Sequence, residues 1–231
     1  MYLGSSRCYQ RRLCFWRVSA LKDLLYIHGF ATDSNAFKAN YLEEKLKDYP
    51  EVNFFRPNFN PSSTDFKHKT ITGMIARLRE FILANELKNP YIIASSLSGI
   101  VALNYAKRYQ NIAGLLLLAP MLRYIQIHTE QEELDWQRKG EIKVQTSFAD
   151  DCYLSYNFAI DARNYQKAVS PPPNCKIIHG KFDETIAFAE SLKYANEHGL
   201  ELSALAAQHS LAEPASLERI WLESKTLLNL A

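Results

Sequence analysis

Three side chains in this 231-residue chain could together transfer an acyl group: those of Ser96, Asp183 and His209. A serine hydroxyl becomes a nucleophile when a histidine takes its proton and a carboxylate orients that histidine. Each of the three lies in a turn or loop after a run that is typical of a strand. These runs are 91–93, 175–178 and 200–205.

Ser96 stands at a predicted sharp turn between the strand at 91–93 and a helix at 100–106. Such a turn pushes the serine hydroxyl out of the sheet and puts the backbone N–H of Leu97 at a helix N-terminus, where negative charge is favoured. The usual spelling of the turn is Gly-x-Ser-x-Gly. Ala94 and Ser98 occupy the two glycine positions, so the motif is degraded here.

A second donor for a developing oxyanion is predicted after the first buried strand, residues 24–27. His28 and Gly29 follow that strand directly, and Gly29 lets the backbone bend without a Cβ penalty. Phe30, or Ala31, would then present its backbone N–H beside Ser96. The alternative interpretation is a turn that ends the strand and carries a structural histidine.

Strands alternate with helices through most of the chain, which predicts an α/β fold with a mostly parallel sheet and helices on both faces. The carboxyl ends of parallel strands meet at one edge of the sheet, so Ser96, Asp183 and His209 are expected there together. The 26 residues from Asp183 to His209 fit one helix and one strand, which is one crossover unit.

The alternation breaks down between residues 121 and 173, where we predict an insertion that forms a small lid. Met121, Trp136 and Tyr156 are candidate walls of a substrate pocket, together with His28 and Gly29. The alternative for each insertion residue is simple packing against the sheet.

Other candidate groups have structural explanations. Glu184 is expected in the first turn of a helix, where it would stabilise the N-terminus. His179 is predicted to be a structural histidine that donates to the backbone near Asp183. His128 and Glu132 lie four residues apart without a third ligand nearby, so no metal is predicted. Since there is no glycine-rich phosphate loop or dinucleotide fingerprint, no cofactor is predicted either.

Composition limits the class of protein. Hydrophobic residues make up 47% and charged residues 23%, an ordinary balance for one soluble domain, and the net charge of +2 gives no reason to expect nucleic-acid binding. No apolar run approaches the roughly 18 residues of a membrane span. The four scattered cysteines indicate reduced thiols in the cytoplasm.

Residues 1–22 differ from the predicted domain at 23–231 because they contain four arginines and no acid. This composition resembles an organelle transit peptide, but a flexible basic tail is the simpler interpretation. The sequence does not indicate an oligomeric state.

Four segments together resemble the α/β-hydrolase superfamily and, within it, the small YqiA-like esterase group. They are Leu-Leu-Tyr-Ile-His-Gly-Phe at 24–30, Ser-Ser-Leu-Ser-Gly at 95–99, His-Gly-Lys-Phe-Asp-Glu-Thr-Ile at 179–186 and Gln-His-Ser-Leu at 208–211. The resemblance covers roughly residues 22–230. The chain departs from the pattern at both glycine positions of the serine turn and at Gln208, where an acidic residue is common.

The resemblance implies a serine hydrolase that cleaves a small-molecule carboxylic ester or acyl thioester through an acyl-enzyme. Ser96, Asp183 and His209 match the catalytic positions in the order serine, acid, histidine. Two alternatives remain open. One is a hydrolase fold kept as a binding or scaffold protein, and the other is hydrolysis of a lactone, amide or lipid at the same residues.

Overall fold

The computed structural model describes residues 21–126 and 128–231. The predicted basic tail therefore lies almost wholly outside the described residues. Its last residue, Lys22, is the first residue of strand β1 (Lys22–Ile27).

Six parallel strands form the central sheet, in the order β2-β1-β3-β4-β7-β8. The other five strands are β2 (Val52–Phe55), β3 (Tyr91–Ser95), β4 (Gly114–Leu118), β7 (Cys175–Gly180) and β8 (Glu201–Leu205). The inner strands β1, β3 and β4 are covered on both faces, which explains why they are continuous apolar runs without alternation. The predicted α/β fold with a parallel sheet is confirmed.

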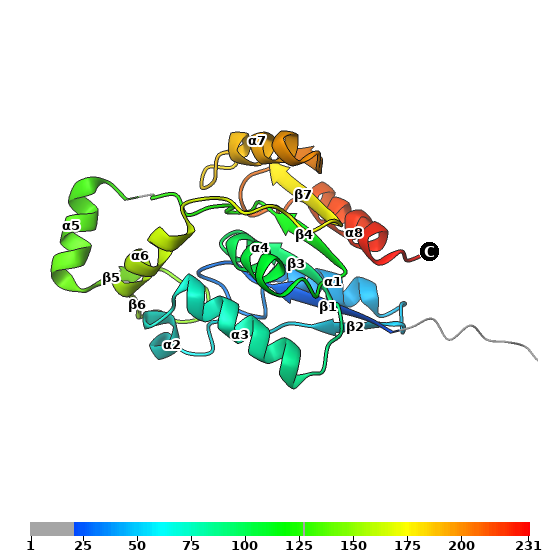
Figure 1. Ribbon diagram of the computed structural model, residues 1–231, viewed down its shortest axis with the longest axis horizontal. Coiled ribbons are helices and arrows are strands. Elements are labelled where there is room, and N and C mark those ends of the chain that lie inside the picture. Colours follow the sequence, from blue (N-terminus) through cyan, green and yellow to red (C-terminus); the bar gives the residue numbers. More distant parts are fainter. Residues whose placement is uncertain (1–20, 127) are drawn as a thin grey trace, which may run out of the picture.

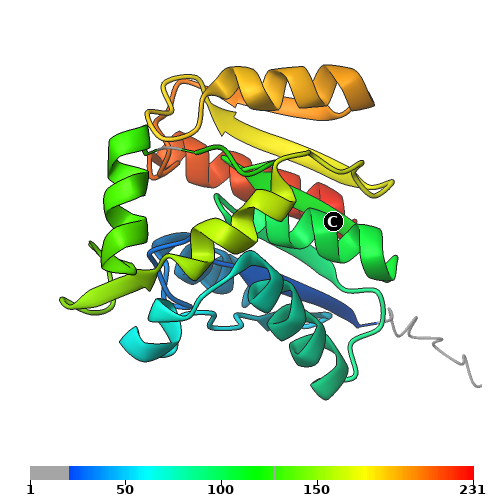
Figure 2. The same ribbon diagram turned by 60° about the vertical axis from the view of Figure 1, so that its left-hand side comes forward.

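Helices cover both faces of this sheet (Figures 1 and 2). Helices α1 (Phe37–Leu46) and α8 (Pro214–Leu228) pack on the face that includes Leu24 and Leu116. Helices α3 (Ile71–Ala84), α4 (Ser98–Tyr109) and α7 (Phe188–His198) pack on the face that includes Leu25 and Leu115. Neighbouring residues of one strand thus enter different cores, as the period of two requires.

The segment after β4 forms a separate small layer at the carboxyl side of the sheet, on the left in Figure 1. It contains α5 (Glu130–Lys139), β5 (Glu141–Val144), β6 (Cys152–Ser155), α6 (Asn157–Ala162) and the 3-10 helix η1 (Arg163–Tyr165). Strands β5 and β6 pair in an antiparallel hairpin. The layer packs against α2 (Ser63–Lys67) and α3.

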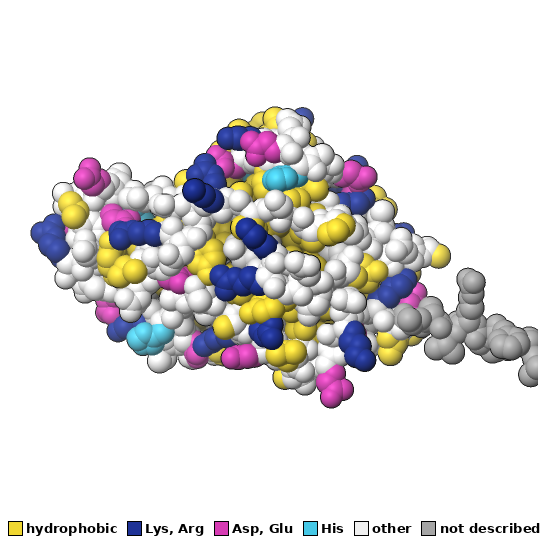
Figure 3. Space-filling model, in the orientation of Figure 1, with side chains coloured by type: hydrophobic (Ala, Val, Ile, Leu, Met, Phe, Trp, Pro, Cys, Tyr) yellow, Lys and Arg dark blue, Asp and Glu magenta, His cyan; other side chains and the backbone are white. Residues whose placement is uncertain are grey.

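Figure 3 shows basic and acidic side chains dispersed over one face of the molecule, with the insertion projecting at one end. None of the helices in the described ranges is long and apolar enough to cross a membrane.

The end of β7 and the segment before His209 approach so closely that only glycine fits between them. A Cβ atom on Gly180 would lie 2.3 Å from the carbonyl oxygen of Ala207, far inside van der Waals contact. Since backbone is on both sides, neither strand end can move independently. This contact holds the loops that carry Asp183 and His209 side by side.

We therefore predict that Gly180→Ala lowers the free energy of unfolding by about 1–3 kcal/mol, the usual cost of overpacking. Gly114→Ala, also in a buried strand, is the matched control. The atoms nearest to its Cβ would belong to the side chains of Asn174 and Leu227, which can move, and not to the backbone. Urea denaturation of both variants measures the difference, and equal losses would contradict this account.

Candidate active site

Ser96 occupies the turn between β3 and α4 with a φ of 55°, in the left-handed region that non-glycine residues seldom adopt. Its N–H donates to the carbonyl of Leu118 at 2.9 Å. Its own carbonyl accepts the N–H groups of Gly99 at 2.9 Å and of Met121 at 3.0 Å. The strained backbone is thus fixed from both sides, as is usual where strain serves a function.

The two non-glycine residues of the serine turn are accommodated without a clash. Ala94 is buried within β3, and Ser98 is buried with its hydroxyl donating to the carbonyl of His28. The close approach between helix and strand falls instead at Gly99, where a Cβ would lie 2.8 Å from Cβ of Pro120. The glycine that this turn requires is therefore Gly99.

The structure brings Ser96, His209 and Asp183 together in one chain of hydrogen bonds. Nε2 of His209 lies 3.0 Å from the Ser96 hydroxyl, and Nδ1 lies 2.8 Å from Oδ2 of Asp183. Since the carboxylate can only accept, Nδ1 carries the proton and Nε2 is free to accept the proton of the hydroxyl. This geometry suits a histidine general base beside a serine nucleophile.

The side chain of Asp183 is buried, yet its carboxylate is held in the ionised form. Oδ1 accepts the backbone N–H groups of Thr185 at 2.8 Å and Ile186 at 2.7 Å. Burial raises the pKa of Asp183, but hydrogen bonds from His179, His209 and Ile186 outweigh it and hold that pKa well below its usual range. The carboxylate therefore stays charged throughout the neutral pH range.

His179 lies fully buried behind this carboxylate. Its Nε2 donates to Asp183 at 2.9 Å and to the carbonyl of Ile186 at 3.0 Å, and its Nδ1 accepts the hydroxyl of Ser191 at 2.7 Å. The prediction that Glu184 lies in the first turn of a helix is wrong, because α7 begins only at Phe188. Its carboxylate instead accepts the backbone N–H of His209 at 3.2 Å.

His28 and Gly29 lie beside the serine, but only Gly29 reaches the open cleft. His28 is buried, with Nε2 accepting the N–H of Phe59 at 2.9 Å and Nδ1 donating to the carbonyl of Gly29 at 2.9 Å. Burial lowers its pKa to about 4, so the ring is neutral. The side chain of His28 therefore supports the loop from behind and does not form a pocket wall.

A cleft of about 590 Å³ opens at Ser96, a size that suits a small organic ligand. Ser96 and His209 lie in its wall, and most of the remaining wall comes from the loop after β1 and the start of α1. Its lining residues are Tyr26, Gly29, Phe30, Ala31, Thr32, Asp33, Asn35, Ala36, Phe37, Lys38, Ser95, Ser96, Ser147, Thr185, His209 and Ser210. Leu97 lies next to it at the start of α4.

Met121, Trp136 and Tyr156 do not line this cleft. Trp136 is buried inside the insertion, donates from Nε1 to the carbonyl of Leu154 at 3.0 Å, and packs edge-on against Tyr156. Met121 approaches Ser96 through its backbone. The insertion needs a core of its own, and its aromatic side chains form it. Of the insertion residues that the structure describes, Ser147 alone lines the cleft, and its N–H donates to the carbonyl of Ala31 at 3.0 Å.

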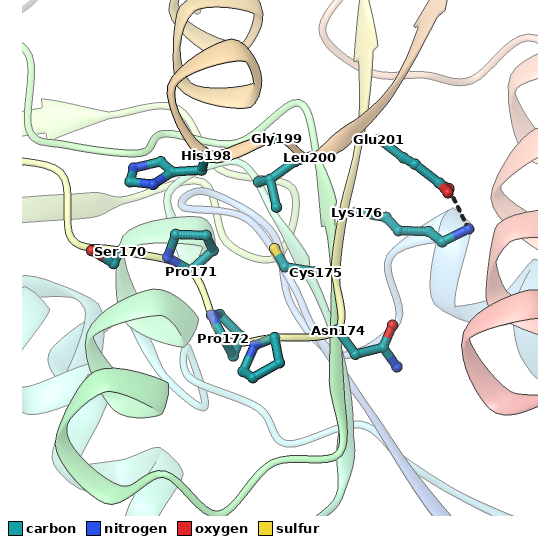
Figure 4. Close-up of a pocket in the computed structure, with 11 residues that line it drawn as sticks. Ser170, Pro171, Pro172, Asn174, Cys175, Lys176, His198, Gly199, Leu200 and Glu201 are labelled. Atoms are coloured by element: carbon teal, nitrogen blue, oxygen red, sulfur yellow. Dashed lines mark ion pairs between the residues drawn. The ribbon is translucent and has the colours of Figure 1, made fainter.

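A second cleft, of about 480 Å³, lies where β7 and β8 begin, at the opposite edge of the sheet from Ser96 (Figure 4). Lys176 in its wall is paired with Glu201, as the dashed line shows. Burial raises the pKa of the Cys175 thiol to about 12, which keeps it protonated and unreactive. Ser170 and His198 also line this second cleft, but within the described residues no hydrogen bond joins them, and Glu201 is paired with Lys176.

Within the described residues, no three His, Cys, Asp or Glu side chains are grouped as metal ligands would be.

Two buried lysines near the first cleft were not predicted. Lys38 donates to the carbonyl of Ser210 at 2.6 Å, and Lys69 donates to the carbonyl of Phe30 at 3.0 Å. Lys38 lies on the same face of α1 as the buried Leu42 and Leu46, so the helical spacing could have indicated that it is buried. Lys69 precedes a helix, and no sequence pattern indicates its burial.

The parallel sheet, the strained serine turn and the order of the three residues define an α/β-hydrolase fold. The chain belongs to the family described as Uncharacterised protein family (UPF0227), the YqiA-like family, whose sequence profile matches residues 23–213. The predicted resemblance is thereby confirmed. No curated protein matches the chain in sequence.

Solved structures with the same fold are distant in sequence. A protein from Agrobacterium vitis S4 is 15% identical over 90% of each chain, with a TM-score of 0.77. A Paleococcus ferrophilus monoacylglycerol lipase is 13% identical over 91% of this chain and 96% of its own, with a TM-score of 0.70. Mouse alpha/beta hydrolase domain-containing protein 10 is 17% identical over 90% of this chain and 89% of its own, with a TM-score of 0.68. At these identities the likeness establishes the fold.

Because His28 is buried in its neutral form, we predict that the free energy of unfolding decreases at acidic pH. Its pKa is about 4 in the folded protein against an ordinary 6.5, so the unfolded chain binds one more proton between these values. Stability from this residue is present above pH 6.5 and is lost as the pH falls toward 4, by about 3 kcal/mol. In His28→Gln this contribution is absent. The difference in unfolding free energy between wild type and variant should therefore shrink from pH 7 to pH 4 in urea titrations, and a constant difference would contradict the assignment.

Proposed function

We propose that this protein is a serine hydrolase that cleaves carboxylic esters or acyl thioesters of small molecules through an acyl-enzyme. The observation that carries the proposal is the hydrogen-bonded chain from the Ser96 hydroxyl through His209 to Asp183, at 3.0 and 2.8 Å. The strained backbone of Ser96, at the mouth of a cleft of suitable size, supports the same role.

In the first half-reaction, the Ser96 oxygen forms a bond to the acyl carbon while Nε2 of His209 takes its proton. Asp183 stabilises the imidazolium and keeps it oriented. The carbonyl oxygen becomes an oxyanion, which the backbone N–H groups of Leu97 and Phe30 would bind. The tetrahedral intermediate collapses when the bond to the alcohol or thiol breaks, and His209 returns the proton to that leaving group.

In the second half-reaction, His209 takes a proton from water as the water oxygen attacks the acyl carbon. Collapse of the new intermediate breaks the bond to Ser96, and the serine oxygen recovers the proton from His209. The carboxylic acid leaves.

The lining of the cleft supports an acyl substrate. Phe30, Ala36 and Phe37 line the same cleft as Ser96 and would contact the hydrocarbon part of the acyl group. The cysteines in the described part of the chain, Cys152 and Cys175, are free and buried. Free thiols fit the reducing cytoplasm, which we propose as the location.

Hydrolysis of p-nitrophenyl esters from acetyl to palmitoyl tests this function. The wild type should release nitrophenol, with a chain-length optimum set by the cleft. Ser96→Ala should lower kcat by at least about a thousandfold, because the nucleophile is lost. Ser170→Ala changes an exposed serine in the wall of the second cleft and should leave kcat unchanged. Full turnover in Ser96→Ala would refute the proposal.

A fluorophosphonate probe tests for an activated serine even if the enzyme accepts only a specialised substrate. Covalent labelling of wild type, but not of Ser96→Ala, supports an activated serine even when no nitrophenyl ester is cleaved. Absence of both labelling and turnover would favour a binding or scaffold protein. Lactone, amide and lipid substrates belong in the same panel, since Ser96 could serve any of them.

A further inference from the structure

Lys69 is a buried cation whose position is not explained by an ion pair. Only 5% of the residue is exposed, and within the described residues no carboxylate lies within ion-pair distance of its Nζ. The amine sits over the rings of Phe30 and Phe66, 5.3 and 5.0 Å from their centroids. Burial, with a smaller effect from Arg77, lowers its pKa to about 7. Burial of a lysine without an ion pair is unfavourable, so some other interaction must compensate for it.

That contact is with the loop beside Ser96. Nζ of Lys69 donates to the carbonyl of Phe30 at 3.0 Å, and Nδ2 of Asn60 donates to the same oxygen at 2.9 Å. The carbonyl belongs to the peptide that joins Phe30 to Ala31. Because a trans peptide is planar, its N–H group, on Ala31, points to the side opposite the oxygen.

The preceding peptide is held in the same manner. The carbonyl of Gly29 accepts Nδ1 of His28 at 2.9 Å and the hydroxyl of Thr32 at 3.4 Å, so the N–H of Phe30 points away from those donors. Two successive peptide planes of the 28–32 loop are thus fixed through their carbonyls. Gly29, Phe30 and Ala31 all line the cleft at Ser96.

We propose that Lys69, together with Asn60, is a positioning residue for oxyanion binding: it locks the Phe30–Ala31 peptide and thereby fixes Phe30, whose own N–H, on the adjoining Gly29–Phe30 peptide, would bind the oxyanion. The inference rests on the proposed function. Lys69 precedes α3 and lies 39 residues from Phe30, so it ties the loop to the scaffold. The amine can donate whether or not it is charged, so the positioning persists on both sides of its pKa.

Replacement of Lys69 by methionine separates positioning from folding. Methionine fills a similar volume without a donor, so the Phe30 carbonyl loses one of its two donors. We expect Lys69→Met to lower kcat about tenfold or more on the best nitrophenyl ester, with KM changed less than about threefold, since preorganised donors act in the transition state. The free energy of unfolding should stay equal or rise, because an unpaired buried amine is removed. Lys69→Arg, which keeps a donor, should retain more turnover than Lys69→Met.

Lys107→Met is the matched control, because Lys107 is an exposed lysine near the far end of α4. It should leave kcat unchanged. Wild-type kcat in Lys69→Met, or a loss in Lys69→Arg as large as in Lys69→Met, would overturn the proposal. So would a fall in kcat that is matched by loss of folded protein.

Backbone ¹⁵N relaxation tests the same inference without turnover. In Lys69→Met the order parameters of residues 29–32 should fall below those of wild type, while those of β3 and β4 stay unchanged. Unchanged order parameters in the 28–32 loop would overturn the positioning role even if the ester is cleaved. If wild type and Ser96→Ala show no difference in turnover, the proposed function fails, and the order parameters still decide whether Lys69 orders the loop.

Discussion

The arrangement of the whole site depends on the close approach of β3 and α4 at Ser96. The chain reverses direction there through a left-handed residue, an arrangement that costs of the order of 1–3 kcal/mol for a residue with a Cβ. Three backbone hydrogen bonds at Ser96 and the contact of Gly99 with Pro120 hold the turn in place. The buried apolar residues of β3 and α4 offset the strain. The serine hydroxyl consequently projects beyond the sheet, and the side chains of His209 and Asp183 must be positioned near it.

The parallel sheet makes this positioning possible, because the segments after β3, β7 and β8 all leave the sheet at the same edge. Strand direction alone brings the loops only into the same region. The remaining alignment comes from backbone contact, where Gly180 lies against Ala207, and from Asp183, which accepts hydrogen bonds from two histidines and two backbone N–H groups. Asp183 is therefore fixed before it orients His209, and little reorganisation is needed when the imidazole takes up a proton.

The fold and the meeting of Ser96, Asp183 and His209 could be predicted from the sequence because both follow from local patterns. Buried parallel strands are apolar throughout, and the loops after them carry the polar groups. The pocket walls could not be predicted in this way. Trp136 and Tyr156 are large apolar residues in an insertion, and such residues serve equally as a wall or as the insertion's own core. Which role they take depends on where the insertion packs, and that depends on its contacts with α2 and α3.

The buried lysines were missed for a different reason. Lysine is nearly always at the surface, so composition and periodicity treat it as a solvent-facing residue. Lys38 and Lys69 instead donate to carbonyls of two irregular loops that flank Ser96. Such loops cannot pair all their peptide groups with each other, and side chains from the surrounding elements must supply the missing donors. A long side chain with a terminal donor reaches across a packed interface where a short polar one does not. The unfavourable burial of an amine is then compensated by the order that it gives to a loop, which is the balance expected where a scaffold serves a reactive site.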